Sequence, residues 1–275
     1  MHAVALALEW LVGLAVLFNA GLYAARTLAL RREIEPLRVE PIGLVNAVWA
    51  FLRECAASVA VALLTPLGLL MSHCRRAAGT RGPVVLVHGW SLSRGSWWLL
   101  RRRLLRDGWS PVCCFDYGSI TADVESAAIQ LGTFVQRLVE ANAAPPALIG
   151  HGLGGLVIRN YAGRCAHAEV QRIITLGTPH QGTDLAARLF PHLKPGSAFL
   201  RDLKASDRAV RRYDVIAIHS TFDAVVLPPS NARYPIALNV QLNDVGHNTL
   251  LFSRRVYGLL AENLAAPLPS QAGGS

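Results

Sequence analysis

The chain has 275 residues, of which 52% are hydrophobic and 16% charged, and its formal net charge is +9. This length suits one α/β domain with a short additional segment, and the low charged fraction favours a membrane-associated protein over a fully soluble one. The basic residues are scattered without a nucleic-acid-binding motif, so we expect no nucleic-acid partner and interpret them as solvated helix faces with some attraction to anionic lipid.

Residues 1–81 are predicted to form a hydrophobic membrane-anchor segment of one or two helices. The run 3–25 is nearly all apolar and long enough to cross the hydrocarbon core of a bilayer, and no Lys or Arg precedes it, which fits a signal peptide poorly. A second uncharged run, 55–73, contains Pro66, which would kink a helix. This run either completes a helical hairpin, with 26–53 as the connecting loop, or lies on the membrane surface or packs on the globular domain. The side of the membrane stays open.

Between residues 82 and 265, short continuous apolar runs alternate with helical stretches. Such runs are typical of parallel strands covered on both faces, and the alternation predicts a doubly wound, mostly parallel α/β sheet. Cys113 and Cys114 lie in one such run and are expected to act as small hydrophobic residues, because the five cysteines give neither a disulfide framework nor zinc-binding spacing. The predicted strands are 83–89, 109–117, 147–150, 172–177, 214–219 and 236–242, and the predicted helices are 97–106, 122–140, 153–162 and 254–264.

Two further stretches bear on the domain's outline. Residues 182–209 contain several large apolar residues with helix-breaking prolines among them, which fits either a lid over a binding site or ordinary packing of a core helix. Residues 266–275 are predicted to be a disordered tail.

Ligands of doubly wound sheets bind at the carboxyl ends of the strands, and several conspicuous residues are predicted to fall there. They include His88, the glycine-rich turn 150–155, which reads GHGLGG, and Asp223. In such a turn small residues are required, because strand and helix pack closely around it.

Four motifs occur in an order that resembles the α/β-hydrolase family, and within it bacterial lipases and esterases. They are VVLVHGW (84–90), LIGHGLGG (148–155), TLGTPHQGT (175–183) and GHN (246–248). The resemblance covers roughly residues 82–265 and implies the α/β-hydrolase fold. It also implies that no cofactor is used, and the residues after His247 predict no calcium site, so no metal is expected.

The resemblance assigns roles to individual residues. Gly152 stands where the family has its nucleophilic serine, Asp223 where it has the acid and His247 where it has the catalytic histidine, with Asp244 as a rival acid. The backbone N–H groups of Trp90 and Leu153 would form the oxyanion hole. The remaining predicted site residues shape the nucleophile turn or hold its loops: Gly150, His151, Gly154, Gly155, His88 and Gly89.

Glycine has no side-chain nucleophile, so no acyl-enzyme can form at Gly152. Three interpretations follow: a degenerate hydrolase that binds an acyl ligand, an inactivated form of an active esterase, or an enzyme with residual activity through a water on His247 or through Ser91 or Ser93. We therefore predict a membrane-anchored protein of the lipase or carboxylic-ester hydrolase type, or a non-catalytic protein that binds lipid or a partner. The expected partners are a lipid or acyl ester and the membrane, here the bacterial inner membrane, with oligomeric state open.

Overall fold

The computed structural model describes residues 2–30, 42–118, 120, 123–142, 144–165, 169–185 and 189–267. These residues form a seven-stranded sheet in the order β1-β3-β2-β4-β5-β6-β7. All neighbouring strands are parallel except β1 and β3, which are antiparallel. The strands are β1 (Cys74–Arg75), β2 (Val84–Val87), β3 (Val112–Phe115), β4 (Ala147–His151), β5 (Arg172–Leu176), β6 (Asp214–Ser220) and β7 (Leu238–Leu242).

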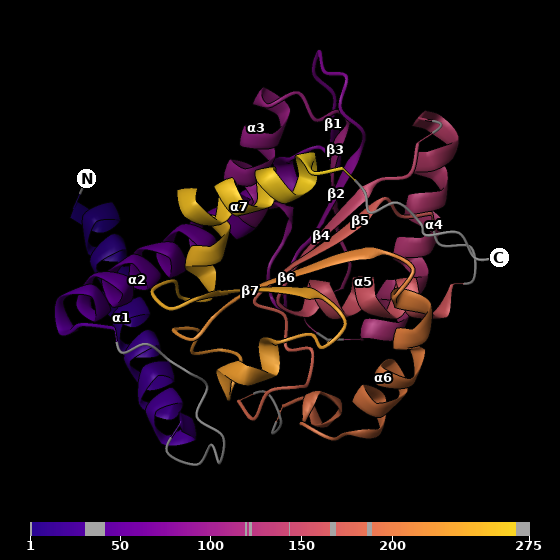
Figure 1. Cartoon of the computed structure of the whole chain (residues 1–275). Coiled ribbons are helices and arrows are strands. Elements are labelled where there is room, and N and C mark those ends of the chain that lie inside the picture. Colours follow the sequence, from indigo (N-terminus) through magenta and orange to yellow (C-terminus); the bar gives the residue numbers. More distant parts are fainter. Residues whose placement is uncertain are drawn as a thin grey trace.

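Helices cover both faces of this sheet, which gives the predicted doubly wound α/β fold (Figure 1). Alternate residues of β2 point to opposite faces of the sheet: Val85 and Val87 pack in one core cluster, and Val84 and Leu86 pack in the other. This alternation explains the continuous apolar runs, because no face of these strands meets water. One cluster packs against α4 (Val124–Asn142), α5 (Leu153–Arg164) and α6 (Ala198–Val210), and the other against α3 (Trp98–Arg106) and α7 (Arg254–Ala265).

The prediction that the cysteines form no disulfide was wrong. Cys74 and Cys113 are joined by a disulfide bond. The short strand β1, which the sequence pattern did not predict, pairs with β3 so that these two cysteines lie directly opposite each other. Cys114, one residue along β3, is buried on the other face as a free thiol, as expected of a small hydrophobic residue.

The N-terminal segment forms two long helices, α1 (His2–Leu30) and α2 (Leu44–Leu67), followed by a short 3-10 helix, η1 (Gly68–Leu70). They lie side by side at one edge of the molecule, and the Asn19 amide donates to the Ser58 hydroxyl at 3.1 Å (Figure 1). The predicted loop 26–53 was wrong, because residues 44–53 are mostly apolar and extend the second helix. Pro66 stands in its last turn, so its missing N–H removes one pairing near the helix end without interrupting the rest of the helix.

The second helix packs on the globular domain, one of the alternatives that the sequence left open. Cys55, Ala57 and Val61 are buried. Gly95, in the 3-10 helix η2 (Arg94–Trp97), approaches α2 so closely that a Cβ there would collide with the Leu64 carbonyl oxygen. Both α1 and α2 are long and apolar enough to cross a membrane, by length and composition alone.

The region 182–209 packs as part of the core where it is described. Leu200, Leu203 and Val210 of α6 are buried in the same cluster as α4 and α5, which favours core packing over a lid for this helix. Residues 186–188 of this region, and residues 268–275 of the predicted tail, lie outside the described residues.

Candidate active site

The turn between β4 and α5 holds Gly152 in an unusual backbone conformation. Its φ is +53° and its ψ is −122°, a region that residues with a side chain adopt only under strain. Its N–H donates to the Leu176 carbonyl oxygen at 2.9 Å, at the end of the neighbouring strand. The turn therefore has the strained strand-to-helix geometry that a nucleophile elbow requires, although its central residue is glycine.

The other glycines of the turn are required by close packing. A Cβ on Gly150 would lie 2.6 Å from the Gly155 nitrogen. A Cβ on Gly154 would collide with the Val87 carbonyl oxygen, and one on Gly155 with the Thr178 hydroxyl. These three glycines therefore let α5 pack directly against the ends of β2 and β5, as the motif predicted.

Asp223 and His247 form a buried pair. The Nδ1 of His247 lies 2.7 Å from Oδ2 of Asp223, which is fully buried in the loop after β6. The other carboxylate oxygen accepts the backbone N–H groups of Val225 at 2.7 Å and Val226 at 3.1 Å. The carboxylate is thus fixed on both sides, and it fixes the histidine tautomer with the proton on Nδ1.

This pairing determines the direction in which the pKa of each group is shifted. Burial alone would raise the pKa of Asp223 and lower that of His247. Their mutual attraction and hydrogen bond outweigh burial, so the pKa of Asp223 is below its ordinary value and that of His247 above it. The pair is arranged so that a proton arriving at Nε2 of His247 is stabilised.

Nε2 of His247 faces the central residue of the turn. A Cβ built on Gly152 would lie 3.3 Å from this nitrogen and 3.8 Å from the Gly89 Cα. Among the described residues, the backbone N–H groups of Leu153, at the first position of α5, and of Trp90 donate to no backbone carbonyl. The structure thus brings the predicted nucleophile position, histidine and acid together, and leaves the two predicted oxyanion donors without backbone partners.

The three histidines predicted to hold loops, His88, His151 and His180, are all buried, and the first two contact the site loops. His151 donates from Nε2 to the His247 carbonyl oxygen at 3.1 Å, and burial, followed by repulsion from His247, lowers its pKa to about 3. It is therefore neutral at physiological pH. His88 lies with Nε2 3.0 Å from Asp116 and stacks on the Tyr117 ring at 4.7 Å, which anchors the loop that contains Gly89 and Trp90.

The alternative candidates are engaged elsewhere or exposed. Asp244 lies 3.0 Å from an Arg255 nitrogen, on the surface, whereas His247 pairs with Asp223. The Ser93 hydroxyl donates to the Thr65 carbonyl oxygen at 2.6 Å and accepts the Gly95 N–H, so it caps η2. Ser91 is exposed, with a positive φ of 55°.

Sequence reasoning missed two residues that shape the site. Gly177, at the end of β5, has a φ of +55°, and a Cβ there would lie 3.1 Å from both Asp223 Oδ2 and His247 Nδ1. A glycine at the last position of a predicted strand was a signal for it. Glu54, on α2, accepts hydrogen bonds from Asn248 and Thr249, immediately after the histidine. Nothing in its surroundings in the sequence indicated this contact.

The arrangement can do the chemistry of acyl transfer if a nucleophile stands at residue 152. It offers a histidine base with an acid partner, facing the first turn of α5 with its positive dipole end. Among the described residues, no group of three or more His, Cys, Asp or Glu side chains is placed to hold a metal ion.

Comparisons with known proteins agree with this fold. Residues 84–268 match the model of the alpha/beta hydrolase family. The Bacillus licheniformis lipase BlEst2 in mature form superposes with a TM-score of 0.59 at 17% identity, covering 68% of this chain and 93% of that one. The Paleococcus ferrophilus monoacylglycerol lipase gives 0.53 at 18%, covering 70% and 98%. The Exiguobacterium antarcticum esterase gives 0.53 at 15%, covering 70% and 95%.

At these identities the solved structures show the same fold and nothing finer. The match over residues 84–268 includes β2 to β7 and the loops that contain Gly152, Asp223 and His247. This chain belongs to the alpha/beta hydrolase family.

Proposed function

We propose that this protein is a membrane-anchored member of the lipase or carboxylic-ester hydrolase type, with a site for acyl esters in which Gly152 replaces the nucleophile. Ester turnover by the unmodified chain is then slow or absent. One observation supports the proposal most: a Cβ on Gly152 would lie 3.3 Å from Nε2 of His247, while Nδ1 of the same ring is bound to Asp223.

A serine at this position would complete a recognisable reaction. Its hydroxyl oxygen would attack the ester carbonyl carbon and pass its proton to Nε2 of His247. The N–H groups of Trp90 and Leu153 would stabilise the resulting oxyanion. The histidine would then protonate the departing alcohol, and water would hydrolyse the acyl-enzyme by the same two proton transfers in reverse order.

Gly152 itself favours a second candidate, a non-catalytic protein that binds a lipid or acyl ester. Glycine removes the nucleophile but leaves the surrounding glycines, the acid and the histidine in place. A site that is preorganised in this way can bind an ester without cleaving it, or cleave it slowly with a water polarised by His247.

The membrane part of the proposal rests on α1 and α2. Many large apolar side chains on both helices are exposed, whereas the opposite side of α2 is bound to the hydrolase domain through Glu54 and Val61. Contiguous exposed apolar surface of this kind is typical of membrane contact. The exposed set includes Trp10, Leu14, Leu17 and Phe18 on α1, and Leu44, Val45, Trp49 and Leu63 on α2.

The two candidate functions are separated by ester hydrolysis assays on four forms of the chain. The forms are the unmodified protein, His247→Ala, Gly152→Ser and Gly152→Ser/His247→Ala, assayed with p-nitrophenyl esters of increasing acyl length. We expect Gly152→Ser to create or greatly raise hydrolysis and the double variant to lose that gain.

The unmodified protein decides between catalysis and binding. Turnover that disappears in His247→Ala supports a slow enzyme, whereas absent turnover with measurable binding of a non-hydrolysable acyl ether supports the binding protein. If Gly152→Ser stays inactive with every acyl length although it is folded, the ester hydrolase proposal is wrong.

A further inference from the structure

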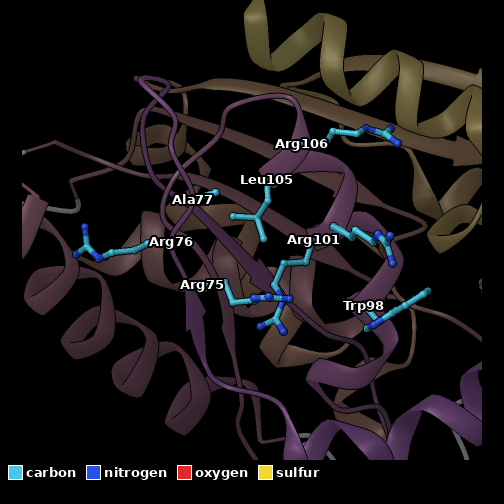
Figure 2. Close-up of a pocket in the computed structure, with 8 residues that line it drawn as sticks. Arg75, Arg76, Ala77, Trp98, Arg101, Leu105 and Arg106 are labelled. Carbon is cyan, nitrogen blue, oxygen red and sulfur yellow. The ribbon is translucent and has the colours of Figure 1, made fainter.

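A pocket outside the candidate active site is lined mainly by arginines. It has a volume of about 460 Å³ and lies between β1 and α3. Figure 2 shows the side chains of Arg75 and Arg101 directed toward one another, with those of Arg76 and Arg106 extending to opposite sides. Its charged and aromatic lining consists of Arg75, Arg76, Arg101, Arg102, Arg106 and Trp98.

The fold brings these arginines together from two separate places in the sequence. The Cys74–Cys113 disulfide and the pairing of Arg75 with Val112 hold β1 against β3, beside α3. On α3, Arg102 and Arg106 are four residues apart, which places them on one helix face. The sequence pattern had suggested scattered basic residues, but at this point they converge.

Arg101 is the most constrained of the set. Arg101 is only 4% exposed. Its guanidinium donates to the Ser72 carbonyl oxygen at 2.6 Å and lies 4.0 Å from the Cys114 sulfur. Among the described residues, no carboxylate lies within ion-pair distance of it. A buried guanidinium without an acidic partner is costly, and an anion in the adjoining pocket would offset that cost.

The rest of the lining leaves this positive charge largely unbalanced. No Asp or Glu lines the pocket, and the described residues give no ion pair to Arg75, Arg76 or Arg102. Arg106 has Asp107 at 3.8 Å, but the Arg106 side chain is 73% exposed, and a pair with such an exposed partner contributes little. The nearby carboxylate of Asp116 is bound to Arg94 and His88 instead.

We propose that this pocket binds a phosphate group. Guanidinium groups suit phosphate oxygens because they offer paired N–H donors in one plane, and Arg75 and Arg101 converge from two elements. The group could belong to the headgroup of an anionic phospholipid or to a soluble phosphate ester. The lipid source fits the surroundings, since Trp98 is 45% exposed and the preceding η1 presents Leu69 and Leu70, which are 76% and 85% exposed.

The proposal is tested with the full chain in dodecyl maltoside micelles, by following the thermal unfolding midpoint as ligand is added. Three probes are used: dioleoylphosphatidylglycerol, dioleoylphosphatidylcholine and inorganic phosphate. The pocket variant is Arg75→Gln/Arg102→Gln, which leaves the buried Arg101 in place. The matched control is Arg137→Gln/Arg208→Gln, which removes two charges from exposed positions on α4 and α6.

We expect phosphatidylglycerol to raise the midpoint of the unmodified and control proteins, and the pocket variant to need about tenfold more lipid for the same shift. If inorganic phosphate gives the same pattern, the site accepts soluble phosphate as well, which also supports the proposal. Phosphatidylcholine should shift all three forms equally. If the pocket variant responds like the unmodified protein, or the control weakens as much as the pocket variant, the proposal is overturned. Ester hydrolysis plays no part in this readout.

Discussion

Glu54 and Thr249 are joined by two hydrogen bonds across the boundary between the N-terminal helices and the hydrolase domain. The Glu54 carboxyl accepts the Thr249 backbone N–H at 2.9 Å and its hydroxyl at 2.7 Å, and it also accepts the Asn248 N–H at 2.8 Å. Gly246 leaves the space for this carboxyl group, since a Cβ there would collide with it. The chain directly after His247 is therefore fixed by a residue that lies outside the family match at 84–268.

Replacing Glu54 by alanine should destabilise the protein and misplace His247. Three donors, two of them on the buried Thr249, would lose their acceptor, which costs about 2–4 kcal/mol in unfolding free energy. In the Gly152→Ser background we expect kcat to fall at least about tenfold with KM nearly unchanged, because the base moves while the acyl site stays. Thermal unfolding and steady-state kinetics measure the two effects.

Two further variants separate positioning from general destabilisation. Glu54→Gln keeps one acceptor oxygen and should lie between alanine and the original residue. Glu140→Ala removes an exposed helical carboxyl on α4 and should change neither quantity. If Glu54→Ala lowers stability but leaves kcat intact, Glu54 is a structural residue only.

Gly177→Ala should disrupt the Asp223–His247 pair. The added Cβ would stand 2.8 Å from the Leu250 side chain and 3.1 Å from the paired atoms, at a φ of +55°. We expect a loss of about 1–3 kcal/mol in unfolding free energy from the backbone conformation alone, measured by chemical denaturation. Gly258→Ala on α7, where nothing lies within 4 Å of the new Cβ, should be neutral or slightly stabilising. Equal losses in the two variants would contradict the packing described for Gly177.

The raised pKa of His247 predicts the pH dependence of any activity at this site. Only the neutral ring can accept a proton, so kcat/KM of Gly152→Ser should fall as pH drops through a pKa above the ordinary value of about 6.5. Asp223→Asn removes the attraction that opposes burial. The acidic limb should therefore move to lower pH, and the maximal rate should fall strongly because the tautomer is no longer fixed.

The same pair stabilises the folded protein, and its two contributions are lost at opposite ends of the pH range. The contribution of His247, whose pKa is raised by folding, is fully present below the pKa of the unfolded chain and is lost as pH rises through the pKa of the folded protein. The contribution of Asp223, whose pKa is lowered by folding, is present above the pKa of the unfolded chain and is lost as pH falls through the pKa of the folded protein. Histidine ring NMR on the unmodified protein checks the first shift, and an acidic limb that Asp223→Asn leaves unmoved would contradict the pairing.

Reduction of the Cys74–Cys113 bond should lower stability. The bond closes a loop with a sequence separation of 39, for which loop-closure entropy predicts a loss of about 4 kcal/mol. Peptide mapping under non-reducing conditions should recover these two cysteines as one linked species, and thermal unfolding with and without reductant should give the difference. Cys165→Ser, at a free thiol, serves as the control. A midpoint that is insensitive to reductant would argue against the bond.

Much of the fold could be predicted from the sequence because the buried parallel strands consist of continuous runs of apolar residues. All six predicted strands have counterparts in the structure. Because these strands are parallel, the turn at Gly152, the loop at Asp223 and the loop at His247 all lie at the carboxyl ends of the strands. The edge strand β1 escaped prediction because it is two residues long and exposed, so it has no apolar pattern.

The contacts of the N-terminal segment could not be predicted, since they depend on how two apolar helices dock. An apolar run signals burial or lipid contact without saying which face meets which. Glu54 stands just before the uncharged run, and its partners lie almost two hundred residues away along the chain. The convergence of Arg75 with Arg101 has the same origin, because only the pairing of β1 with β3 brings them together.

The backbone at Gly152 has a consequence for how the protein could change. Glycine adopts the left-handed turn without strain, whereas a serine there would cost about 1–3 kcal/mol and would push the His247 ring by a few tenths of an ångström. Codons for glycine and serine can differ by a single base. The shortest genetic route from this chain to an acyl-transfer enzyme is therefore one point mutation, opposed by backbone strain and not by any missing partner.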